Sequence, residues 1–237
     1  MKHYWPSFEE FTALAERGNT VPVYRQLLAD ALTPVMAYER LARLVSAKPA
    51  GNAFLLESVV GGERIARFSF AAADPEITIT ARRDEMTIRR RDGGEEAITT
   101  HDPLAEMGRL LDDYRHVHIS ALPRFTGGLV GYAAYDLIRY YEDLGNGPPD
   151  DRDLPDLSFG LYRTMVIFDH VSKTIKVTAN AHVRGDPRRA YLDAVEAIER
   201  TISVLREGRG RSVGEISLRD LPAKGFQSNF TREEYMK

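Results

Sequence analysis

The stretch Ile77-Thr78-Ile79-Thr80, followed shortly by Met86-Thr87-Ile88-Arg89, alternates apolar and polar side chains. Successive side chains of a β-strand point to opposite faces of a sheet, so this alternation predicts two half-buried strands, over 76–81 and 85–91. The turn residues Asp92-Gly93-Gly94 follow directly and predict a hairpin. Other runs rich in β-branched and aromatic residues predict further strands, over 53–60, 65–72, 117–120, 128–135, 161–169 and 174–181.

Helix start signals separate these strands into groups. Ser7 and Glu10 form a capping box, and a capping residue precedes a first-turn proline in Thr33-Pro34, Asp102-Pro103 and Asp186-Pro187. These signals predict helices over 7–17, 33–45, 102–114 and 186–207. Hairpins that alternate with segregated helices predict an α+β fold, in which antiparallel or mixed β-sheets are covered by helices.

The composition is that of an ordinary globular protein. Hydrophobic residues make up 43% of the 237 residues and charged residues 28%, which allows one large domain or two small ones. The 35 acidic and 32 basic side chains give a net charge of −3, which provides no general attraction to nucleic acid or to an anionic membrane.

Cysteine is absent from the sequence. Disulfides, thiolate metal ligands and a cysteine nucleophile are therefore excluded. The first residues lack the apolar stretch of a signal peptide, and no uncharged run approaches the ~20 residues that span a bilayer. We therefore expect a cytoplasmic protein.

Three glycines lie beside aromatic residues in Arg124-Phe125-Thr126-Gly127-Gly128-Leu129-Val130-Gly131-Tyr132. A phosphate cradle is one interpretation, but neither the Gly-Lys-Ser/Thr nor the Gly-x-Gly-x-x-Gly fingerprint is present. We expect instead that these glycines let the backbone turn and let another segment approach closely.

His116 and His118 are two residues apart and would share one face of a strand, as two ligands of a metal do. No third histidine or carboxylate lies at ligand spacing nearby, so we interpret both as surface or interface residues and predict no metal site. A Gly-x-Ser-x-Gly nucleophile motif is absent too, and no carboxylate pair can be assigned acid and base roles. No catalytic residue is predicted in this chain.

The segment Leu55-Leu56-Glu57-Ser58 ends an apolar strand with a carboxylate and a hydroxyl. A serine hydroxyl can hydrogen-bond a small ligand, and a glutamate can pair with an ammonium group. Together with apolar neighbours, these are the groups that an amino-acid site needs. A strand end that simply meets solvent is the alternative that the residues alone leave open.

Three parts of the sequence together resemble the amino-terminal half of anthranilate synthase component I, in order and over nearly the whole chain. They are Leu55-Leu56-Glu57-Ser58-Val59 with the residues up to Asp74-Pro75, then Arg124 to Tyr132 with Tyr135-Asp136, Arg139-Tyr140 and Glu142, and finally Ser228-Asn229-Phe230-Thr231-Arg232-Glu233-Glu234-Tyr235. The resemblance implies an α+β domain that helps to bind the feedback inhibitor L-tryptophan. It places Glu57 and Ser58 at the inhibitor site, with Arg67 and Ser69 from the following strand as further candidates.

The resemblance also implies an activity for the intact protein, which would make anthranilate and pyruvate from chorismate and glutamine or ammonia. Chorismate, the Mg²⁺ cofactor and the catalytic residues would belong to a further half, so this chain alone would be inactive. A glutamine amidotransferase subunit would be the protein partner. No cofactor, nucleic acid or membrane is expected for this chain itself.

Thr231 and Glu234 form another capping box, and Lys237 follows after barely two turns. A helix that short is marginal without packing partners. We therefore expect a tryptophan-binding regulatory domain at 1–207, a linker at 208–227 and the start of a truncated chorismate-binding domain at 228–237. A naturally frayed tail is the alternative.

Two departures from the family pattern lie close to the expected inhibitor site. Val60 replaces a commonly acidic residue, and Ala71-Ala72 replaces a commoner Ile-Gly, which leaves the inhibitor affinity open. Two rival identities also stay open. They are the related aminodeoxychorismate synthase component I and a stand-alone module that binds an amino acid or a protein.

Overall fold

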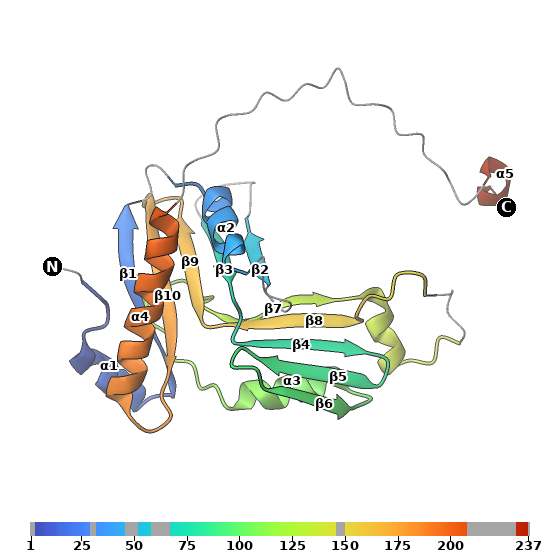
Figure 1. Ribbon diagram of the computed structural model, residues 1–237, viewed down its shortest axis with the longest axis horizontal. Helices are drawn as coiled ribbons and strands as arrows, with labels where there is room; N and C mark the ends of the chain where they lie inside the picture. The colour runs from blue at the N-terminus through green and yellow to red at the C-terminus, as the bar shows by residue number, and fades with distance from the viewer. Residues whose placement is uncertain are drawn as a thin grey trace, which may run out of the picture.

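The computed structural model describes residues 3–28, 32–45, 52–57, 67–145, 150–207 and 231–236. Its strands form two five-stranded sheets, and neighbouring strands in both sheets pair antiparallel. Figure 1 shows the strands of the first sheet running across the direction of those of the second, with helices packed against both. The predicted α+β class is confirmed.

The first sheet has the strand order β1-β10-β9-β3-β2. Its strands are β1 (Thr20–Leu28), β10 (Thr174–His182), β9 (Thr164–Asp169), β3 (Phe68–Ala73) and β2 (Ala53–Leu56). Three helices pack on one of its faces, α1 (Phe8–Ala15), α2 (Pro34–Arg43) and α4 (Pro187–Arg206). Buried side chains from these helices and from the inward face of the sheet form one core cluster, which includes Phe11, Leu41, Val177 and Ile198.

The predicted helix starts are confirmed, because each capping side chain accepts the expected backbone hydrogen bond. Ser7 and Glu10 form the capping box of α1, Thr33 Oγ1 accepts from the N–H of Met36 at 3.2 Å, and Asp186 caps α4. The capping box at Thr231 is also present and begins the short helix α5 (Arg232–Tyr235). These caps satisfy backbone donors that have no partner inside the helix.

The second sheet has the order β6-β5-β4-β8-β7. Its strands are β6 (Glu95–Thr99), β5 (Glu85–Arg90), β4 (Ile77–Arg82), β8 (Leu157–Tyr162) and β7 (Gly128–Ala133). Helix α3 (Pro103–Asp112) and the 3-10 helix η1 (Tyr135–Tyr140) contribute Met107 and Leu137 to its core. The alternating stretches 77–80 and 86–89 form β4 and β5, as predicted.

The expectation of a single strand over 161–169 is wrong, because the chain changes sheets at Arg163 and forms β8 and β9. Arg163 pairs with Glu76, with its Nε 3.1 Å from Oε2 and its Nη1 3.2 Å from Oε1. Glu76 itself lies where the chain crosses from β3 to β4. Both strands are largely buried and mostly apolar, and only Arg163 and Thr164 interrupt the apolar run at the crossing, where no turn residue marks the change of sheet.

The expected strand at 117–120 is also wrong. Val117 is buried and its N–H donates to Thr20 O at 2.9 Å, but the pairing there is an isolated bridge between Thr20 and His116. Strand β6 and the 3-10 helix η1 were not predicted, since β6 is mostly exposed and has little apolar pattern. The predictions at 58–66 and the linker at 208–227 lie outside the described residues, and the division of the chain into domains stays a prediction.

The expected role of the glycine-rich stretch is confirmed at two positions. Thr126 is buried and its carbonyl accepts from Asn180 Nδ2 at 3.1 Å, which brings the chain against β10. A Cβ on Gly127 would lie 2.7 Å from Tyr162 O, and a Cβ on Gly131 would lie 2.6 Å from the Cα of Phe159. Both distances are too short for any side chain, so the strand β7 approaches its neighbours closely because these residues are glycine.

We predict that Gly131→Ala lowers the free energy of unfolding by about 3 kcal/mol, because the backbone of β8 must move to admit the methyl group. Gly108→Ala is the matched control. Nothing lies within 4 Å of its Cβ position in α3, so the same change should add up to ~1 kcal/mol through helix propensity. Urea unfolding monitored by circular dichroism measures both, and equal effects of the two variants would contradict the close approach.

Candidate functional site

Three strand ends meet at one end of the first sheet, at its upper edge in Figure 1. Leu56 of β2 pairs with Phe70 of β3, and Phe68 of β3 pairs with Asp169 of β9. Glu57 therefore follows β2, Arg67 precedes β3 and Asp169 ends β9, all at the same edge. We refer to these three strand ends as the β2–β3–β9 edge.

Arg67 forms a two-point ion pair with Asp169. Its Nε donates to Oδ1 at 3.1 Å and its Nη2 donates to Oδ2 at 2.8 Å. The Arg67 side chain is 43% exposed and that of Asp169 is only 3% exposed. The guanidinium also lies over the ring of Phe68, 4.8 Å from its centroid. The pair therefore holds a half-exposed cation in one orientation.

The carboxylate of Asp169 is fixed by its own turn as well. Its Oδ1 accepts the backbone N–H groups of Val171 at 3.1 Å and Ser172 at 3.3 Å. Burial by itself raises the pKa of Asp169, but the hydrogen bonds from Arg67, Ser172 and Val171 outweigh burial and lower the pKa to about 2. The group is therefore ionised throughout the neutral range, as its pairing with Arg67 requires.

Ser69 lies inside β3 and is fully buried. Its Oγ is 2.7 Å from His170 Nε2, the distance of a hydrogen bond between a nucleophile and a general base. Because the hydroxyl is closed off from solvent, a substrate cannot reach it. This serine therefore serves to fix the end of β3 against the residue that follows β9.

Glu57 is exposed and makes no hydrogen bond or ion pair with the residues that the structure describes. The strand register, continued by one residue beyond Leu56, sets Glu57 across from Ser69 and two residues from Arg67. Ser58 lies outside the described residues. The structure thus brings Glu57, Arg67 and Ser69 to one edge, and says nothing of Ser58.

Sequence reasoning missed Asp169 and His170, the two partners at this edge. The sequence analysis assigns no role to His170 and places Asp169 only at the end of a predicted strand. The signal that was available is the turn Asp169-His170-Val171-Ser172, in which an aspartate side chain bonds backbone groups two and three residues on. Nothing in the sequence pairs this turn with Arg67, 102 residues away.

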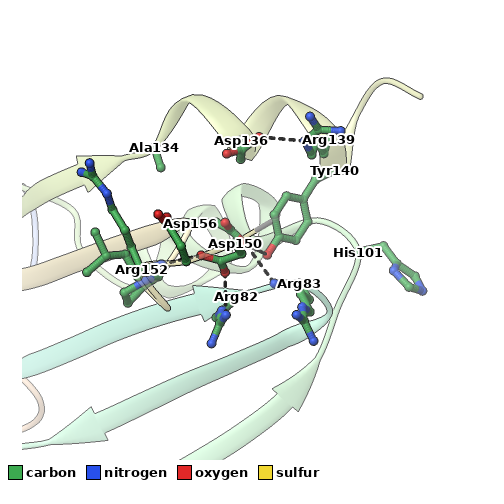
Figure 2. Close-up of a pocket in the computed structure, with 13 residues that line it drawn as sticks. Arg82, Arg83, His101, Ala134, Asp136, Arg139, Tyr140, Asp150, Arg152 and Asp156 are labelled. Atoms are coloured by element: carbon green, nitrogen blue, oxygen red, sulfur yellow. Dashed lines mark hydrogen bonds and ion pairs between the residues drawn. The ribbon is translucent and has the colours of Figure 1, made fainter. Parts of the chain in front are cut away.

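A second candidate is a pocket of about 800 Å³ between the β4–β5 hairpin, η1 and the segment 150–156. Figure 2 shows charged side chains around it, including Arg82, Asp136, Arg139, Asp150 and Asp156. Most of these charged groups form ion pairs with each other. Arg82 Nη2 donates to Asp150 Oδ2 at 2.6 Å, and Arg139 Nε donates to Asp136 Oδ1 at 2.7 Å.

Asp156 links two walls of that pocket through hydrogen bonds. Its Oδ2 accepts from the backbone N–H of Arg83 at 2.9 Å and from the Tyr140 hydroxyl at 3.1 Å. Burial and the bond to Asp156 raise the pKa of Tyr140, so its hydroxyl stays protonated and donates. The polar groups of this pocket therefore connect the β4–β5 hairpin, the segment 150–156 and η1 to one another. The β2–β3–β9 edge is the better candidate for a ligand site.

The chain resembles known proteins over most of its length. A family model for chorismate binding enzyme matches residues 51–237. The chain belongs to this family of chorismate binding enzymes. The match begins well before residue 228, where the sequence reasoning expected a chorismate-binding part to start, and does not confirm that division.

Relatives in this family are identical to the chain at about a third of the aligned positions. Anthranilate synthase component 1 of Acetivibrio thermocellus is 34% identical over 83% of this chain and 38% of its own length. The Aquifex aeolicus (strain VF5) protein of the same name is 33% identical over 97% of this chain and 45% of its own. The crystal structure of anthranilate synthase component I from Streptococcus pneumoniae TIGR4 matches 77% of this chain and 37% of its own, with a TM-score of 0.45 and 26% identity. The chain thus spans less than half the length of these relatives.

The described ranges contain neither a cluster of metal ligands nor a membrane-spanning helix. No three histidine, aspartate or glutamate side chains among these residues are grouped to hold a metal ion. No helix there is long and apolar enough to cross a membrane.

We predict that Asp169→Asn lowers the free energy of unfolding by about 2 kcal/mol at pH 7, and that this difference disappears in acid. The folded pKa of about 2 lies below the ordinary value of 3.8, so the ionised group stabilises the fold above pH ~4. That contribution is lost as the pH falls toward 2. Asp151→Asn, which removes an exposed carboxylate, should leave stability almost unchanged. Urea unfolding from pH 7 to pH 2 measures both, and a pH-independent difference for Asp169→Asn would contradict the assignment.

Proposed function

We propose that this chain is the regulatory part of an anthranilate synthase component I and that an amino acid binds at the β2–β3–β9 edge. The observation that carries the proposal is the pair of opposite charges there. The carboxylate of Glu57 is uncommitted among the described residues, and the guanidinium of Arg67 is held in place yet half exposed. An amino acid offers an ammonium group to the first and a carboxylate to the second.

The surroundings favour an amino acid with a large apolar side chain, and L-tryptophan is the one that we propose. Leu56 is exposed beside Glu57, and Phe68 lies under Arg67 with Phe70 next to it, 6.2 Å between ring centroids. Aromatic rings favour offset or edge contacts with another ring such as indole. The names of the curated relatives support the same choice, since anthranilate is a precursor in the tryptophan pathway to which the resemblance points.

The activity of the whole protein follows as part of the proposal. Chorismate and ammonia would be converted to anthranilate and pyruvate, with ammonia delivered by a glutamine amidotransferase subunit. Magnesium and the catalytic groups would belong to the further half of the protein that the resemblance implies. Tryptophan would inhibit by binding two conformations of the whole protein with different affinity, since only differential affinity shifts such an equilibrium.

We predict that Glu57→Gln and Ser58→Ala, each made in the protein that contains this chain, raise the tryptophan concentration for half-inhibition at least tenfold. Each change removes a group that would bind the ammonium or a polar atom of the inhibitor. Glu85→Gln, an exposed glutamate of the second sheet, is the matched control and should behave as the parent does. Anthranilate fluorescence measures the reaction with chorismate and ammonium.

Two results would contradict the proposal. Identical inhibition curves for the parent and both variants would show that tryptophan does not bind at this edge. Formation of aminodeoxychorismate in place of anthranilate would assign the protein to the related synthase.

A further inference from the structure

His182, at the end of β10, is a buried histidine whose two ring nitrogens both have hydrogen-bond partners. Its side chain is only 4% exposed. Nδ1 lies 3.1 Å from Thr20 Oγ1 at the start of β1, and Nε2 accepts a hydrogen bond from Arg184 Nε at 2.8 Å. The ring of Tyr114, which follows α3, lies beside the imidazole with 4.7 Å between ring centroids. His182 therefore lies where the first sheet meets the end of α3.

The hydrogen-bond network fixes which nitrogen of this imidazole carries the proton. Asn19 Oδ1 accepts the backbone N–H of Arg115 at 2.7 Å and the hydroxyl of Thr20 at 3.1 Å. Because the Thr20 hydroxyl donates to Asn19, its oxygen accepts from His182, so Nδ1 carries the hydrogen. Nε2 then offers a lone pair, which the N–H of Arg184 requires. The imidazole of His182 is therefore neutral in this arrangement.

A proton added to Nε2 would convert this acceptor into a donor. It would face the N–H of Arg184 across 2.8 Å, with a positive charge on each side, so that hydrogen bond would be lost. An alternative acceptor lies close by, because Asp113 Oδ2 is 3.5 Å from Nε2 and also pairs with Arg184. Protonation would therefore release Arg184 from the ring and attract the imidazolium toward Asp113.

We propose that His182 is a proton-sensitive contact between the end of β10 and the end of α3. With the imidazole neutral, Arg184 bridges His182 and Asp113, the C-cap residue of α3. With the imidazole charged, that bridge is lost and a charge is buried at this corner of the fold. Burial of a charge is costly, so the charged state favours conformations in which water reaches the ring. Mildly acidic pH thus loosens the end of α3 from the first sheet.

Charged groups from several elements lie near this ring. They are Arg184, Arg163, Asp113 and Glu76. The two arginines disfavour a charge on the imidazole, whereas the two carboxylates favour it. Burial has the largest effect and, with the arginines, lowers the pKa of His182 below its ordinary value of 6.5. Tyr114 stays protonated, because burial raises its pKa.

The direction of the pH effect follows from this lowered pKa. Between the pKa of the folded protein and the ordinary value, the unfolded or opened chain binds the proton and the closed corner does not. Stability therefore rises with pH in this range. The contribution of the neutral His182 contact is present above pH ~6.5 and is lost as the pH falls below that value.

The first test measures the pKa of His182 in the protein that contains this chain, by mass spectrometry of hydrogen exchange at C2 of each imidazole ring. Arg184→Ala should raise the pKa of His182, because the facing cation is lost, and Asp113→Asn should lower it, because the alternative acceptor is lost. The exposed His101 is the internal reference, and its exchange should be the same in all variants. Shifts of the same sign in the two variants, or no shift in either, would overturn the inference.

The second test follows the corner itself by exchange of backbone hydrogens. Protection of the amides of Tyr114 and Arg115 should fall about fivefold from pH 7 to pH 5, after correction for the intrinsic rate, while the peptide of β5 should show no such change. His182→Gln keeps an oxygen that can accept from Arg184 but cannot be protonated, so it should abolish this pH dependence. A fall in protection of the same size in His182→Gln would overturn the inference.

The two tests do not depend on the same variants. Arg184 and Asp113 are 68% and 53% exposed, so their replacement leaves the core intact, and circular dichroism establishes that each variant is folded. The first test therefore stands even if His182→Gln fails to fold. The inference is also independent of the proposed amino-acid site, so failure of either leaves the other in place.

Discussion

The structure depends on two neighbouring places where the chain passes from one sheet to the other. β3 leads into β4 and β8 leads into β9, and the ion pair between Arg163 and Glu76 links the two crossings. As a result β3 pairs with β9 in the first sheet while β4 pairs with β8 in the second. The backbone therefore runs directly from one sheet into the other at two places. The strand ends at these crossings are fixed in position relative to both sheets.

This arrangement also explains where the candidate site lies. Antiparallel pairing of β3 with β9 brings the start of one strand against the end of the other, so Arg67 meets Asp169 and Ser69 meets His170. The same edge carries Glu57 at the end of the edge strand β2. A ligand that displaced Arg67 would also displace the start of β3, which continues into β4 of the second sheet. The proposed inhibitor site is thus connected to a larger part of the fold than its few residues suggest.

Local signals were enough to predict most elements of this fold, because capping residues, turn glycines and the alternation of 77–80 each act over a few residues. Local signals failed where the structure is set by contacts between distant parts of the chain. The break at Arg163 lies inside an apolar run and is imposed by the crossing between sheets. At the candidate site, the Leu-Leu-Glu-Ser motif pointed to Glu57 and the family resemblance pointed to Arg67 and Ser69. Asp169 and His170 lie beside them through a pairing between strands far apart in the sequence, which no local signal reveals.

The central claim is that an amino acid binds at the β2–β3–β9 edge, and a crystal structure of the full-length protein with L-tryptophan tests it most directly. The account predicts the ligand carboxylate beside the exposed part of the Arg67 guanidinium, its ammonium group beside Glu57, and the Arg67–Asp169 pair intact. Tryptophan bound elsewhere, for example in the pocket beside Tyr140, with this edge empty, would contradict the claim.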